Sequence, residues 1–99
     1  MQRVFKRQDR PKLGDAVDRL ANITAQPNSA VLIGLDNHFD HWTVLKAVGP
    51  AHLELFDSSG YARVRIANCR MSDEEKLVAR REHVIRPRAV FQIRAGISG

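Results

Sequence analysis

A chain of 99 residues builds one small domain, because it is too short to enclose a second hydrophobic core. With 43% hydrophobic and 27% charged residues it is typical of a globular protein, and no run approaches the roughly 18 apolar residues of a membrane-spanning helix. The single cysteine, Cys69, excludes an internal disulfide, and no apolar segment follows the basic N-terminus, so we expect a cytoplasmic protein without a secretory signal.

The net charge of +5 is concentrated near the N-terminus. Five basic residues and one acidic residue fall in the first twelve positions, which leaves eleven basic and ten acidic residues for the rest of the chain. The five are Arg3, Lys6, Arg7, Arg10 and Lys12. This distribution predicts a basic tail over residues 1–12, either solvated or in contact with an anionic partner.

The first predicted elements are a helix and a buried strand. Apolar residues recur at helical spacing over Leu13–Ile23, which predicts an amphipathic helix. Pro27 and Asn28 then predict a turn. The wholly apolar run Ala30–Leu35 is long enough for one buried central strand.

The middle of the chain predicts three consecutive strands. His41–Val48, Ala51–Asp57 and Tyr61–Ile66 are rich in residues that favour strands, and short turns separate them. Such connections argue for antiparallel pairing.

The last third predicts a helix and a final strand. Ser72 and Glu75 have the spacing of a capping box, which predicts a helix to about Val84, and Pro87 prevents its continuation. Arg88–Arg94 is the last predicted strand. The order α-β-β-β-β-α-β indicates an α+β domain over residues 13–95, with an antiparallel sheet of about five strands, two helices and a frayed end at 96–99.

His41 and Asp57 are the first candidates for chemistry. If Val48–Pro50 forms a three-residue loop, His41 lies directly opposite Asp57, with Cβ atoms roughly 4.5–5.5 Å apart; a two-residue loop loses this pairing. A carboxylate in that position fixes the tautomer of the imidazole, whose other nitrogen can deprotonate a nucleophile. The same spacing is also compatible with a hydrogen bond between His41 and Asp57 at the end of the hairpin that has no catalytic role.

The segment His41-Trp42-Thr43-Val44, sixteen residues before the Asp of Leu53-Glu54-Leu55-Phe56-Asp57, resembles the C-terminal half of papain-like cysteine peptidases. The pattern is most similar to the bacteriocin-processing peptidases that cut after double-glycine leaders, and to their uncharacterised bacterial relatives. The resemblance covers residues 13–67 and extends to the final strand. It implies that His41 is a general base, that Asp57 orients it, and that Trp42 lines the substrate cleft.

Two departures from the family pattern concern the nucleophile and the residue after the aspartate. The family places its cysteine on a helix well upstream of the histidine, whereas none of the forty residues before His41 is a cysteine. Ser58 follows Asp57 where the family often has proline. Cys69, next to Arg70, is the remaining candidate nucleophile. We therefore expect a peptidase-type half-domain that is inactive by itself, uses no cofactor, and dimerises or takes a partner chain over an apolar sheet face, with a peptide as substrate.

Two alternatives to the peptidase-type interpretation are a binding module and a metal site. The chain could be a small basic module whose residues 1–12 contact nucleic acid or an acidic protein. Asp36, His38, Asp40 and His41 are potential metal ligands within six residues, but zinc sites usually draw ligands from separated pairs, and no Cys or His cluster completes this one. We therefore expect no metal site.

Overall fold

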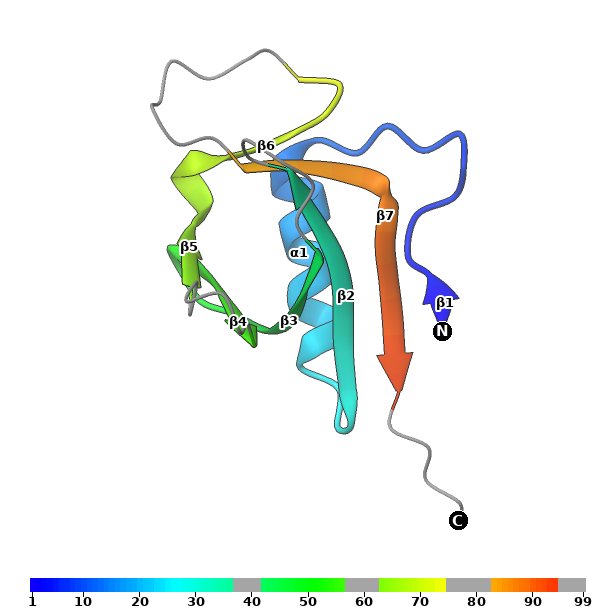
Figure 1. Ribbon diagram of the computed structural model, residues 1–99, viewed down its shortest axis with the longest axis vertical. Helices are drawn as coiled ribbons and strands as arrows, with labels where there is room; N and C mark the ends of the chain where they lie inside the picture. The colour runs from blue at the N-terminus through cyan, green and yellow to red at the C-terminus, as the bar shows by residue number, and fades with distance from the viewer. Residues whose placement is uncertain (37–41, 57–62, 75–82, 95–99) are drawn as a thin grey trace.

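A computed structural model describes residues 1–36, 42–56, 63–74 and 83–94. In this part of the chain, seven strands form one sheet in the order β1-β7-β2-β3-β4-β5, with β6 paired to β7, and a single α-helix packs against it (Figure 1). The elements are β1 (Gln2–Arg3), α1 (Leu13–Thr24), β2 (Ser29–Asp36), β3 (Trp42–Val48), β4 (His52–Phe56), β5 (Arg63–Arg65), the 3-10 turn η1 (Ile66–Asn68), β6 (Cys69–Met71) and β7 (His83–Arg94). All pairings are antiparallel except β6 with β7.

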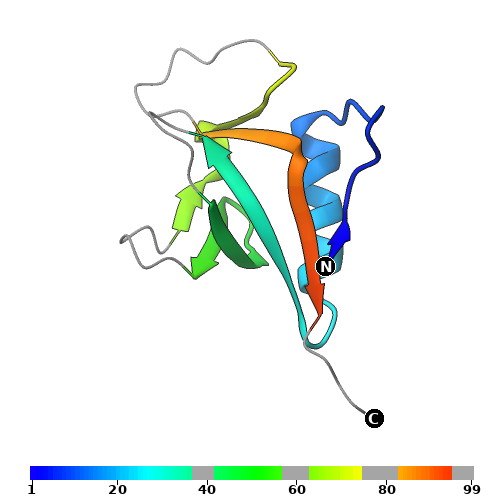
Figure 2. The same ribbon diagram turned by 45° about the vertical axis from the view of Figure 1, so that its right-hand side comes forward.

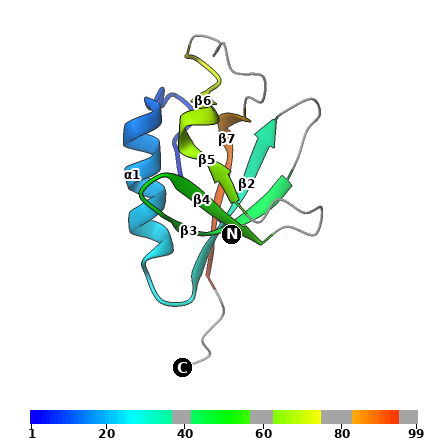
Figure 3. The same ribbon diagram turned by 90° about the vertical axis from the view of Figure 1, so that its left-hand side faces the viewer.

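Helix α1 covers one face of the sheet (Figure 3). Ala16, Leu20 and Ile23 are buried and pack with the core residues of the sheet, as the helical spacing predicts. Asn28 has φ 60°, in the left-handed region that asparagine tolerates, and turns the chain into β2. The predicted helix, turn and buried strand are confirmed.

Strand β2 lies at the centre of the sheet, between β7 and β3. Val31 and Ile33 are fully buried on the side of α1, whereas Leu32 faces the other side and is half-buried. Successive side chains alternate between the two faces of a strand. We call the side turned away from α1 the outer face.

Strand β7 turns a sharp corner at residues 86–89 (Figure 1). Val90 pairs with Ile33 and Ile85 pairs with Leu35, so four residues of β7 pass opposite Gly34 alone. A Cβ atom on Gly34 would approach the Cβ of Ala89 to 3.0 Å, so the glycine permits the close approach of the two strands. Pro87 fits this corner because a bulge tolerates a residue without an N–H.

The predicted basic tail is part of the fold. β1 pairs with β7 at the sheet edge (Figures 1 and 2), and Val4 and Phe5 are 5% and 4% exposed. The backbone N–H of Val4 donates to the carbonyl of Val90 at 3.1 Å. Val4 and Phe5 therefore anchor the N-terminal segment to the core, although five basic residues surround them in the sequence.

The expected helix after Ser72 differs from the structure at both described ends. Residues 72–74 form a turn, in which the Glu74 carboxylate accepts the N–H of Met71 at 2.9 Å, and His83 already belongs to β7. Residues 75–82 lie outside the described part. The α+β class is therefore confirmed. The described residues contain seven strands and one helix, where about five strands and two helices were expected, and β7 begins five residues earlier than predicted.

Candidate functional site

His41 and Asp57, the predicted base and orienting residue, directly precede β3 and directly follow β4 in the sequence. Both residues are outside the described part of the chain. The described register pairs Val44 with Phe56 and Val48 with Leu53, and it slips by one residue at Lys46. The described part of the hairpin therefore does not have the register of a three-residue loop, because four residues separate Val48 from Leu53 and β3 contains a bulge.

The described residues next to His41 and Asp57 in the sequence are joined by a hydrogen bond between β3 and β4. Thr43 is 4% exposed, and its Oγ1 donates to the carbonyl oxygen of Phe56 at 3.2 Å. This bond joins β3 to β4 one residue before Asp57 in the sequence. Trp42, the predicted cleft residue, is 52% exposed, and Phe56 is 62% exposed.

These two aromatic residues belong to the outer face of the sheet. The register places Leu32 beside Phe91 and Val44, and Val44 beside Phe56, so all four share one face. Trp42 pairs with Gly34 on the same face. No described element covers this face, since α1 packs on the opposite one (Figure 3).

Cys69 does not have the environment of a reactive thiol. It lies on strand β6 rather than in a loop, is 2% exposed, and its Sγ donates to the carbonyl of Arg65 at 3.5 Å. Burial raises the pKa of the Cys69 thiol to about 12, so it stays protonated at neutral pH. A catalytic thiolate needs a lowered pKa and access to substrate.

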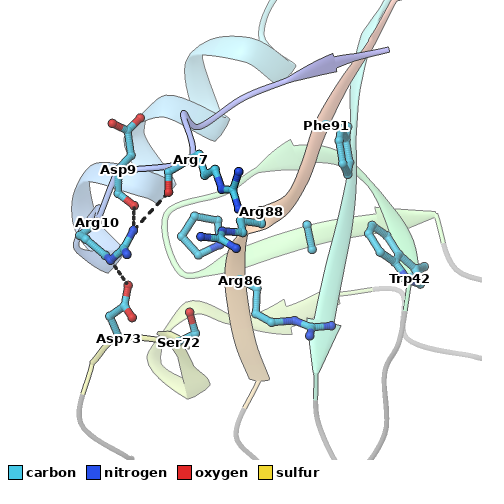
Figure 4. A pocket seen from close by; sticks show the side chains of 11 residues that line it. Arg7, Asp9, Arg10, Trp42, Ser72, Asp73, Arg86, Arg88 and Phe91 are labelled. Atoms are coloured by element: carbon cyan, nitrogen blue, oxygen red, sulfur yellow. Dashed lines mark hydrogen bonds and ion pairs between the residues drawn. The ribbon is translucent and has the colours of Figure 1, made fainter.

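A groove of about 640 Å³ lies beside Trp42 (Figure 4). It combines residues of the N-terminal segment, the turn after β6, the start of β3 and the corner of β7. We call it the Arg–aromatic groove, and its lining residues are Arg7, Asp9, Arg10, Trp42, Ser72, Asp73, Arg86, Pro87, Arg88, Ala89 and Phe91. Its volume is within the range of ligand sites.

The four arginines of the groove differ in their partners. Arg86 contacts Asp36 through Nε at 2.9 Å and Nη2 at 3.2 Å, and Arg10 Nε lies 3.5 Å from Asp73. Arg7 and Arg88 are exposed and form no ion pair within the described residues. These two guanidinium groups are available to an anion.

The structure distributes the five predicted basic residues over different environments. Arg3 lies on β1 with its guanidinium carbon 5.2 Å from the centre of the Phe91 ring, and Arg7 and Arg10 line the groove. Lys6 and Lys12 do not line it; Lys12 is the N-cap residue of α1. No local pattern in the sequence indicates that Phe91 and the arginines of β7 join this cluster.

Neither a metal cluster nor a membrane helix is found in the described ranges. No group of three metal-ligating side chains occurs among them, and Asp36 is in its ion pair with Arg86, while His38, Asp40 and His41 lie outside these ranges. No helix there is long and apolar enough to cross a bilayer. A scan against protein-family models and searches of curated proteins and of solved structures found no match.

Proposed function

We propose that this chain is a papain-like, peptidase-type half-domain that acts through association with itself or with a partner chain. His41 is its general base and Asp57 orients the imidazole. The nucleophile comes from a cysteine outside these 99 residues. The proposal follows the resemblance of residues 41–57 to the histidine–aspartate half of such peptidases.

The exposed outer face is the observation that carries the proposal. Trp42 and Phe56 are more than half exposed and adjoin His41 and Asp57 in sequence. Leu32, Val44 and Phe91 extend the apolar surface across three strands. An apolar sheet face of this kind is stabilised when a second element covers it.

The state of Cys69 supports an external nucleophile. Its thiol is buried and protonated at neutral pH, and its Sγ is engaged with a backbone carbonyl. A histidine cannot activate a thiol that substrate does not reach. The base and its orienting aspartate therefore serve a thiol of a partner chain, because a second copy of this chain would bring only another buried Cys69.

Light scattering at low and high salt tests the association. We expect a dimer or larger assembly that persists at high salt, because apolar contacts are insensitive to screening. Phe56→Ser should dissociate it, whereas Arg65→Ser, at an exposed position of β5, should not. A monomer at both salt concentrations would refute self-association.

The pairing of His41 with Asp57 has its own test. A nearby carboxylate raises the pKa of an imidazole, so Asp57→Asn should lower the pKa of His41, followed by NMR, by about one unit or more. Glu54→Gln, a carboxylate on the same β4 strand, serves as the matched control and should leave it unchanged. An unaltered His41 pKa in Asp57→Asn would contradict the base–orienter assignment.

A further inference from the structure

We propose that the Arg–aromatic groove binds an acidic polypeptide segment in which carboxylates flank an aromatic side chain. The inference rests on the proposed function in one respect, since the segment belongs to the associating partner or to its substrate. The site itself is argued from the groove alone.

The cationic part of the groove selects carboxylates. Arg7 and Arg88 are exposed and without ion pairs among the described residues, whereas Arg10 and Arg86 already contact Asp73 and Asp36. A guanidinium group binds a carboxylate through two parallel hydrogen bonds. Two available arginines therefore fit two carboxylates.

The aromatic part of the groove offers a surface for a ring. The centroids of Trp42 and Phe91 are 6.3 Å apart, with the rings tilted by 30°. Gly34 lies under the indole, where even a Cβ would be 3.7 Å from it, so no side chain separates Trp42 from the sheet. Figure 4 shows Arg7 and Arg88 between these rings and the Asp9–Asp73 side of the groove.

The charge of the groove favours a peptide over single-stranded nucleic acid. Asp9 and Asp73 line the groove, and a phosphodiester chain would bring one negative charge per nucleotide past them. A peptide can place two carboxylates at the arginines and none near the aspartates.

Fluorescence of Trp42, the only tryptophan of the chain, reports on the groove directly. The probes are a blocked Glu-Phe-Glu peptide, its Gln-Phe-Gln analogue and an oligothymidylate. We expect the acidic peptide to change the Trp42 emission and to bind more tightly than the analogue. Because hydrogen bonds between a guanidinium group and a carboxylate are charge-assisted, Arg88→Gln and Arg7→Gln should each weaken binding about tenfold or more.

Arg65→Gln, an exposed arginine outside the groove, is the matched control and should bind as the wild type does. Equal affinity for the two peptides, unchanged binding in Arg88→Gln, or a response to oligothymidylate alone would overturn the inference. The titration is repeated with Phe56→Ser, so that association does not cover Trp42. A wild-type protein that is monomeric but binds the acidic peptide would refute the proposed self-association and leave the groove site standing. A dimer that does not bind the peptide would refute the groove site and leave the self-association standing.

Discussion

Phe5→Ala tests whether the N-terminal segment belongs to the fold. Phe5 is 4% exposed and joins the core cluster, although it follows Arg3 and precedes Lys6 in the most basic part of the chain. The guanidinium carbon of Arg19 lies 5.3 Å from its ring centre. Removing the ring therefore loses both buried area and this contact with α1.

The expected cost is about 3 kcal/mol, at the lower end of the range for buried phenylalanine, because a segment near a chain end can relax into part of the cavity. Domains of this size have unfolding free energies of about 5–15 kcal/mol, so the variant should remain folded and measurable. For fewer than 100 residues this loss corresponds to a fall in Tm of roughly 12–24 °C.

Urea unfolding followed by circular dichroism measures the effect. Lys6→Ala is the matched control, because this exposed side chain has no hydrogen bond or ion pair in the described part. Lys6 binds Asp9 through its backbone, whose N–H donates to the Asp9 carboxylate and whose carbonyl accepts the Asp9 N–H. It should change the unfolding free energy by less than about 0.5 kcal/mol. A loss below about 1 kcal/mol in Phe5→Ala would show that residues 1–5 are a solvated tail.

Two further substitutions address the corner of β7 and the buried thiol. Gly34→Val should lower the unfolding free energy by about 1–3 kcal/mol, because the new side chain would collide with Ala89. Gly14→Ala is the control: a Cβ there meets nothing within 4 Å, so the unfolding free energy should stay the same or rise by up to about 1 kcal/mol. Equal unfolding free energies in the two variants would refute the close approach of β2 and β7 at Gly34. Cys69 should resist thiol reagents at pH 8 until the protein is unfolded, and rapid labelling of the folded protein would contradict its burial. Since burial raises its pKa to about 12, its stabilising contribution is complete below the unfolded value near 9 and is lost as pH rises toward 12, a decline that Cys69→Ala should lack.

Local patterns predicted the elements whose periodicity is strong. The apolar spacing over Leu13–Ile23 and the run Ala30–Leu35 correspond to α1 and β2, because both segments bury one face against the core irrespective of their partners. The three middle strands also follow their alternation. The capping-box pattern at Ser72 predicted a helix that the structure lacks at its two described ends. At the first end the Glu74 carboxylate accepts the backbone N–H of Met71 in a turn, and at the other end β7 begins at His83.

The candidate site was less accessible to sequence reasoning. The family resemblance singles out Trp42 as a cleft residue, and the structure shows only that its side chain is 52% exposed. The groove beside it depends on Arg7 and Arg88, which are 81 positions apart and meet only because β1 pairs with β7. Cys69 could not be distinguished from a reactive thiol without knowing its burial.

The sequence by itself determined the α+β class, the helix, the central strand and the three strands that follow it, since these depend on side-chain periodicity and turn residues close in the chain. Tertiary structure decided the docking of Val4 and Phe5, the register of the β3–β4 hairpin and the corner of β7 opposite Gly34. Each of these depends on which distant surfaces are buried together, and the free energy of that burial outweighs the local preference of a charged segment for water.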